Sequence, residues 1–296
     1  MALGAAACCP AGSASKAERP GTAADEIVRW AVTRVLVVPT ARGACDSGSR
    51  SSPGRPVRRA DPRRYGANVA SGPAVDAFAT EAGRLTEIIS GVDDAALDRA
   101  SPCPPWTVRE LLCHVRIGVG RVPVMLAEPE PPPGPLIDAP GYYRPDQRFS
   151  PAVNDDRIAT AQRAAVGAGP AAQLARELDQ TWRDAWALMR GAPQGRVVRT
   201  RHGDRMLFTE FVRTRVLELA VHGLDLAAGL DRTPWLTGAA AAVVEELVLP
   251  AGSAALREEA GWDQTTLVAM ATGRLPFGPS DAALMERHGL RRLALG

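Results

Sequence analysis

Lysine is nearly absent from this chain, so arginine carries the basic charge. Lys16 is the only lysine among 35 basic residues, which 33 acidic residues offset to a net charge of +2. A preference for arginine of this kind indicates a GC-rich genome rather than a nucleic-acid surface. Because no stretch interleaves basic with aromatic residues, we expect no nucleic-acid partner.

The five cysteines follow no spacing that points to a disulfide framework or a metal site. Their number is odd and no two are spaced as CxxC, which argues against disulfide scaffolds and cysteine-ligated zinc. This usage is typical of a reducing compartment, so we expect a cytoplasmic location. We expect Cys113 to be an ordinary buried residue. The cysteines are Cys8, Cys9, Cys45, Cys103 and Cys113.

Long apolar runs and several common enzyme motifs are missing as well. No stretch approaches the roughly 18 apolar residues that a membrane span requires, and the opening MALGAAACCP lacks the charged region and apolar length of a secretory signal. We therefore expect no membrane partner. Neither GxSxG nor GxxxxGK followed by Ser or Thr occurs, which argues against serine-hydrolase and P-loop chemistry.

Composition divides the chain into three parts. Residues 1–72 are dominated by Ala, Gly, Ser, Pro and Arg and cannot bury enough apolar area to offset chain entropy, so we expect a mostly disordered leader. Within it, Glu26–Val38 has the pattern of a short helix or strand. Residues 73–230 are expected to form a four-helix bundle, and residues 231–296 a helical extension that packs on the bundle. The predicted fold class is all-α.

The helices of residues 73–230 are expected from apolar periodicity and end signals. The second begins with a capping box, Thr107 with Glu110 three residues later, and is expected to bend near Pro123. The expected segments cover about 74–91, 106–126, 153–190 with a break at 167–170, and 209–229.

Two connections between these helices have their own signatures. Residues 128–151 form a proline-rich loop, far above the usual length of about 4–6 residues. Tyr142 and Tyr143 give this loop aromatic side chains that can fold over a pocket. Residues 196–208 are expected to form a short hairpin that turns at residues 203–204.

A strip of four ionisable residues interrupts the last bundle helix, RTRVLELAVHGLDLAAG. At about 100° per residue, the four fall within roughly 80° of one another, with apolar residues on both sides. One interpretation is a ladder of ion pairs on a narrow exposed face. In the other, Glu218 and His222, one turn apart, converge on a metal ion together with a third ligand from another element. The strip consists of Arg215, Glu218, His222 and Asp225.

His114 is the candidate third ligand. It lies on the second helix at the edge of the apolar stripe, one turn from Leu111 and Gly118, and is expected to face the bundle interior. A lone histidine there is more often a hydrogen-bonded core residue. A second helix that also presents polar groups inward favours a metal ligand over a core residue, because facing helices build metal sites in bundle cores.

These residues lie in two segments that together resemble a known family. PCPPWTVRELLCHV, followed about a hundred residues later by RTRVLELAVHGLDLA, resembles the mycothiol-dependent maleylpyruvate isomerase N-terminal domain family, within the DinB-like superfamily of metal-binding four-helix bundles. The resemblance covers about residues 74–230. The matching positions are Pro105, Trp106, Thr107 and His114, then Arg215, Glu218, His222 and Asp225.

The resemblance implies a divalent metal, zinc above all, held by His114, Glu218 and His222. Three protein ligands with an open fourth position make a catalytic site. Asp225 is expected to orient His222 or to pair with Arg215, so Arg215 and Asp225 are the candidate catalytic residues. If Asp225 were instead the fourth metal ligand, the catalytic interpretation would be weaker.

The resemblance also implies the reactants. The thiol cosubstrate would be mycothiol, the low-molecular-weight thiol of actinobacteria, activated by the metal for attack on a small electrophile. The outcome would be isomerisation or S-transfer. A dicarboxylate substrate would call for arginines, for which Arg215, Arg183 and Arg274 are candidates.

Two alternatives stand beside this interpretation. In the first, a bundle with bound metal acts without catalysis, as a sensor or a partner-binding module. In the second, His114 and the strip from Arg215 to Asp225 make ordinary polar contacts in a metal-independent helical protein.

Overall fold

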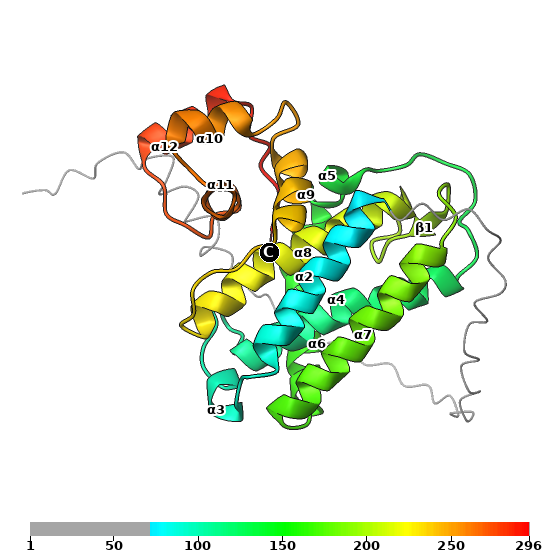
Figure 1. Ribbon diagram of the computed structural model, residues 1–296. Helices are drawn as coiled ribbons and strands as arrows, with labels where there is room; N and C mark the ends of the chain where they lie inside the picture. The colour runs from blue at the N-terminus through cyan, green and yellow to red at the C-terminus, as the bar shows by residue number, and fades with distance from the viewer. Residues whose placement is uncertain (1–71, 296) are drawn as a thin grey trace, which may run out of the picture.

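The computed structural model describes residues 72–295, which are mainly helical (Figure 1). The predicted all-α class is confirmed, with one two-stranded hairpin as the only sheet among the described residues. The expected leader, including Glu26–Val38, lies outside these residues. No helix within 72–295 combines the length and apolar character needed to cross a membrane.

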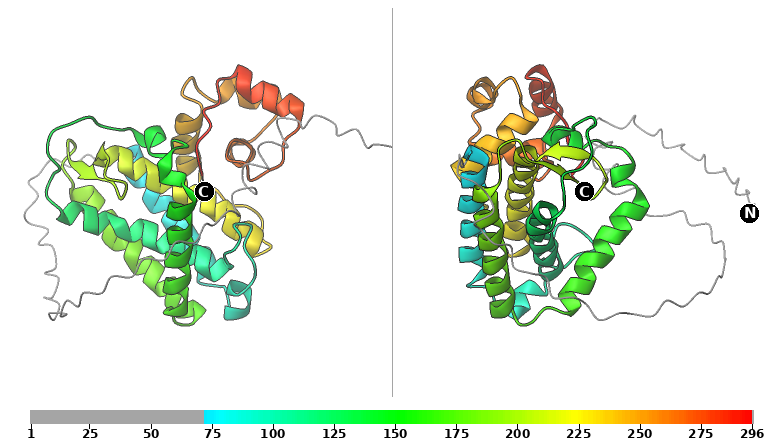
Figure 2. Two further views of the ribbon diagram at one scale, coloured as in Figure 1. Left: turned by 180° about the vertical axis from the view of Figure 1, so that it is seen from behind. Right: turned by 90° about the vertical axis from the view of Figure 1, so that its right-hand side faces the viewer.

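Four long helices form a ring in which each packs against two others: α2 contacts α7 and α8, and α4 contacts the same two. A further helix, α6 (Pro151–Val166), lies against α4 outside the ring (Figure 2). The predicted break at residues 167–170 therefore separates a bundle helix from a flanking one. The ring consists of α2 (Pro73–Ile89), α4 (Val108–Ala127), α7 (Ala171–Gly191) and α8 (Phe208–Gly229).

Local sequence signals explain where α4 begins and how it continues. The Thr107 side chain accepts a hydrogen bond from Glu110 N, and the Glu110 side chain accepts one from Thr107 N, so the predicted capping box is present. The helix runs on through Pro123 to Ala127. This start fixes the register that turns His114 inward.

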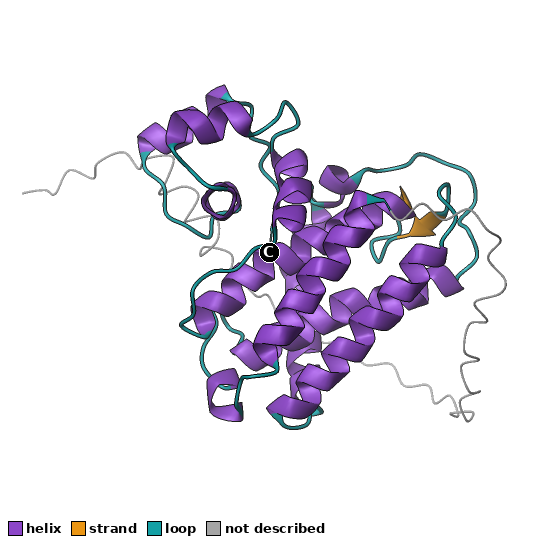
Figure 3. Cartoon of the chain, viewed as in Figure 1, coloured by secondary structure: helices purple, strands orange, loops and turns teal. Residues whose placement is uncertain are grey.

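The connection between α4 and α6 folds back over one end of the ring. It contains α5 (Ala139–Tyr142) and the short η2 (Gln147–Phe149), and Tyr142 and Tyr143 are buried. The hairpin pairs β1 (Val197–Arg199) with β2 (Arg205–Leu207), and Gly203 has the positive φ of 88° that its tight turn requires. Figure 3 shows the hairpin beside the loop.

The C-terminal helices pack onto the bundle through α9, which contacts α2 and α8, and α11, which contacts α8 and α9. Near the end of the described chain, Ala294 N donates a hydrogen bond to Tyr143 O. The segment comprises α9 (Gly238–Val248), α10 (Ala254–Ala260), α11 (Gln264–Ala271) and α12 (Pro279–Arg287). A single turn, α3 (Asp94–Leu97), precedes α4.

Helix α8 is covered on nearly every side, because α2, α4, α5, α9 and α11 all pack against it. Its ionisable strip is therefore interior. Arg215, His222 and Asp225 are only 4%, 5% and 5% exposed. An ion-pair ladder on an exposed face, the first interpretation of the strip, does not describe this helix.

Candidate metal centre

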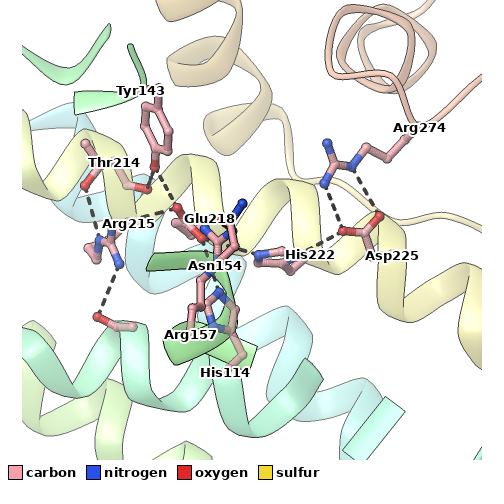
Figure 4. A network of polar contacts seen from close by, with 11 residues as sticks. His114, Tyr143, Asn154, Arg157, Thr214, Arg215, Glu218, His222, Asp225 and Arg274 are labelled. Atoms are coloured by element: carbon pink, nitrogen blue, oxygen red, sulfur yellow. Dashed lines mark hydrogen bonds and ion pairs between the residues drawn. The ribbon is translucent and has the colours of Figure 1, made fainter. Parts of the chain in front are cut away.

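Three side chains from two helices meet between α4 and α8, on the side of the ring where α6 lies (Figure 4). His114 comes from α4, and Glu218 and His222 come from successive turns of α8. Their possible ligand atoms all lie within 4.8 Å of one another. Glu218 Oε2 is 3.3 Å from His222 Nε2 and 3.8 Å from His114 Nε2.

The donor set fits a divalent metal ion. Two imidazole nitrogens and one carboxylate oxygen are ordinary zinc ligands, and atoms bound at about 2.0–2.2 Å with tetrahedral angles lie roughly 3.3–3.5 Å apart. The distances of 3.3 and 3.8 Å from Glu218 Oε2 are close to that spacing. Small side-chain adjustments would bring all three donors onto one ion.

His222 is held by a chain of polar contacts behind it. Its Nδ1 lies 3.0 Å from Asp225 Oδ2, and Arg274 Nε and Nη2 each donate to an Asp225 oxygen at 3.2 Å. Burial opposes a charge on His222, but its contacts with Asp225 and Glu218 raise the pKa of the ring well above its usual value, so a metal ion would have to displace the Nε2 proton. The Asp225 carboxylate holds the other ring proton on Nδ1 and so directs Nε2 toward Glu218. Burial alone would raise the pKa of Asp225, but the contacts with His222 and Arg274 hold that pKa below its usual range. Arg274, not Arg215, is the arginine that pairs with Asp225.

Glu218 is positioned through its other oxygen. Tyr143 Oη lies 2.9 Å from Glu218 Oε1, and Arg215 Nη2 lies 3.9 Å from the same atom. Burial opposes the charge of Glu218, yet its two histidine contacts and Arg215 keep its pKa well below the usual value. The charged carboxylate therefore turns Oε2 toward the histidines.

His114 is a neutral imidazole. Burial lowers its pKa to about 4. The Trp106 ring stacks on it with a centroid distance of 4.7 Å and an interplanar angle of 29°. A neutral ring is the form that binds a metal, and the stacking restricts its orientation.

A cavity of about 70 Å³ adjoins these donors, with His114, Glu218 and His222 in its wall. Arginines dominate the rest of its polar lining. Arg215 and Arg274 line it, but Arg183 does not: it lies on α7 and pairs with Asp179 on a largely exposed surface. Sequence reasoning missed three further lining arginines, because they come from separate elements and share no motif. They are Arg121, Arg157 and Arg201.

Cys103 is a further residue that sequence reasoning did not single out. Its sulfur lies within 4.8 Å of possible ligand atoms of His222 and Asp225, so these three form an alternative donor group. Arg274 already occupies the Asp225 carboxylate. We therefore favour the group of His114, Glu218 and His222. Cys113 is fully buried and belongs to neither group.

Comparison with protein-family models assigns the family. The mycothiol maleylpyruvate isomerase N-terminal domain matches residues 78–227. The chain belongs to this family. The family match contains all three donors and Asp225, whereas Arg274 lies beyond it.

The crystal structure of the mycothiol-dependent maleylpyruvate isomerase aligns with 69% of this chain and 90% of its own, at 14% sequence identity and a TM-score of 0.46. No curated protein matches the sequence.

Proposed function

We propose that this member of the mycothiol maleylpyruvate isomerase N-terminal domain family is a metalloenzyme that uses mycothiol against a small electrophile. The observation that carries the proposal is the convergence of His114, Glu218 and His222 at the wall of a cavity. Three protein donors beside a cavity leave room for a further, exchangeable ligand, as in catalytic zinc sites. The family match supports mycothiol as the thiol.

Zinc is the proposed ion, because it accepts two imidazoles and one carboxylate. When bound, it supplies a Lewis acid that lowers the pKa of an adjacent thiol or water. The surrounding residues keep the donors ready: Asp225 holds the His222 ring, while Tyr143 and Arg215 hold Glu218. We assign Arg215 and Asp225 positioning roles.

The proposed reaction begins when the thiolate adds to an electrophilic carbon of the second substrate. A sulfur–carbon bond forms and a carbon–carbon double bond becomes single. If the molecule rotates about that bond and the thiolate leaves, the double bond returns as the opposite isomer. If the adduct takes up a proton and is released, the product is an S-conjugate.

A non-catalytic metal site would be closed by a fourth side chain. Asp225 was the candidate for that position, but its oxygens contact His222 Nδ1 and Arg274. Both contacts favour the catalytic interpretation over a sensor or partner-binding module.

Elemental analysis of the purified full-length protein tests the metal. We expect near-stoichiometric zinc or another divalent ion in the wild type and its loss in His222→Ala, because a tetrahedral site tolerates the removal of one of three donors poorly. His288→Ala is the matched control, since His288 pairs with Glu259 away from the cavity. Folded wild-type protein without metal would refute the proposal.

A further inference from the structure

The cavity beside the candidate metal donors has an excess of positive charge. Five arginines line it, but only two carboxylates do, Asp156 and Glu218. Two of the arginines have their charge compensated within the protein: Arg215 lies 3.9 Å from Glu218, and Arg274 is bonded to Asp225. The other three carry the excess.

These three are Arg121 on α4, Arg157 on α6 and Arg201 in the turn between β1 and β2. Within residues 72–295, none of them forms an ion pair. Arg157 donates to Asn154 Oδ1 at 2.6 Å, and Arg201 donates to His202 Nε2 at 3.0 Å; both acceptors are neutral groups. No hydrogen-bond partner for Arg121 is found in the same part of the chain.

Solvation alone does not account for this arrangement. The side chains of Arg121 and Arg157 are partly buried, and burial lowers the pKa of both guanidinium groups. The charge of Arg201 lowers both further, and that of Glu218 opposes the shift without cancelling it. Grouping like charges in a partly desolvated cavity is unfavourable unless an anion binds among them. Three separate elements nevertheless direct arginines to this one cavity.

We propose that Arg121, Arg157 and Arg201 form an oxoanion subsite that binds a carboxylate or phosphate group of the electrophilic substrate. Guanidinium groups bind such groups through paired, charge-assisted hydrogen bonds. The cavity volume of about 70 Å³ is larger than a single water needs, which leaves room for a compact acid. That the anion is the substrate rests on the proposed function; the subsite itself does not.

Binding of small anions to the full-length protein tests the subsite. Isothermal titration would compare fumarate, inorganic phosphate and the uncharged fumaramide. We expect both anions to bind and fumaramide not to bind. Tighter binding of phosphate would assign the subsite to a phosphate ester, and tighter binding of fumarate to a carboxylate; either result supports the proposal.

Substitutions then locate the bound anion. Arg121→Gln and Arg157→Gln should each weaken binding by about tenfold, since each removes a charge-assisted contact. Arg201→Gln should weaken it about threefold, because Arg201 is exposed and its contacts are screened by solvent. The matched control is Arg176→Gln on the exposed face of α7, away from the cavity. Because Arg201 lies in an exposed turn, its variant should fold even if another fails.

The variant His222→Ala separates this proposal from the proposed function. If the arginines hold the anion, fumarate binding persists in His222→Ala even after the metal is lost. Equal affinities for the three arginine variants and Arg176→Gln would overturn the subsite, as would loss of anion binding in His222→Ala alone, which would place the anion on the metal.

Discussion

Tyr143 places a neutral hydrogen-bond donor on a carboxylate that is otherwise surrounded by histidines and arginine. Its hydroxyl is 2.9 Å from Glu218 Oε1 and 3.1 Å from Thr214 O, and its side chain is only 2% exposed. A donor on Oε1 restricts rotation of the carboxylate and so fixes where Oε2 points. Replacing a group that orients a metal ligand in this way commonly weakens metal binding by about 10- to 100-fold.

Tyr143→Phe should therefore weaken zinc binding by about tenfold, the lower end of the range for residues that orient ligands. The aromatic ring is retained, so core packing is preserved. Competition with a chromophoric chelator measures the affinity, and the thermal unfolding midpoint of the metal-free protein serves as the control. Unchanged zinc affinity would show that Arg215 alone positions Glu218.

The sequence could indicate the three candidate donors and Asp225 behind His222, but not Tyr143, which orients Glu218. Glu218 and His222 stand one turn apart on a helix, and His114 lies at a definable position on another. Periodicity reaches such residues because helix geometry fixes their direction. Tyr143 comes from a loop without periodicity, so its contact with Glu218 depends on tertiary packing alone.

At the scale of helices and strands, capping signals and apolar periodicity predicted where the helices lie in the sequence, but not how they are arranged in space. The break at residues 167–170 was visible, but not that α6 would lie outside the ring. The burial of α6 gives the physical reason: Ala161 is its only buried residue among the sixteen of the helix. A helix without an apolar stripe has little hydrophobic driving force to enter a core.

The junction of α2 and α9 contains a buried acid. Glu81 is fully buried on α2, and its Oε2 accepts hydrogen bonds from Thr237 N at 2.9 Å and Thr237 Oγ1 at 2.6 Å. Thr237 in turn caps α9. Burial raises the pKa of Glu81 above 4.5, opposed by its bonds to Thr237 and the charge of Arg84. The carboxyl thus links two helices at an electrostatic cost.

This raised pKa fixes the direction of a pH effect. The folded state holds the proton of Glu81 more tightly than the unfolded state does, so the associated stability is fully present below pH 4.5 and is lost as pH rises through the folded-state pKa. Glu81→Gln should remove this dependence and, because an amide oxygen still accepts from Thr237, equal or exceed the wild type in stability at pH 7.

Urea denaturation between pH 4.5 and 8 measures the effect. Glu81→Ala is the contrasting variant: it removes the acceptor of the two half-buried Thr237 donors and should lower the free energy of unfolding by about 1–3 kcal/mol. Parallel pH curves for wild type and Glu81→Gln would contradict the assignment of the charge penalty to Glu81.

Across the whole molecule, the cavity is built from more than the family domain. The family match ends at residue 227, yet Arg274 and Leu295 from the C-terminal segment line the cavity. Arg274 follows α11 and donates to Thr272 O at 2.7 Å within its own segment, while its bonds to Asp225 tie it to the bundle. The extension therefore completes the polar chain that runs from Arg274 through Asp225 to His222.

Arg274→Gln tests whether this chain couples the extension to the metal site. Without the guanidinium, Asp225 retains only its contact with His222, and the carboxylate that orients the ring gains freedom. We expect zinc affinity to fall by about tenfold, as for other residues that act on a ligand from behind. Arg287→Gln is the matched control, because Arg287 pairs with Glu259 inside the extension. Equal zinc affinity in the two variants, with both folded, would mean that the extension covers the cavity without supporting the metal, and that Asp225 alone sets the orientation of His222.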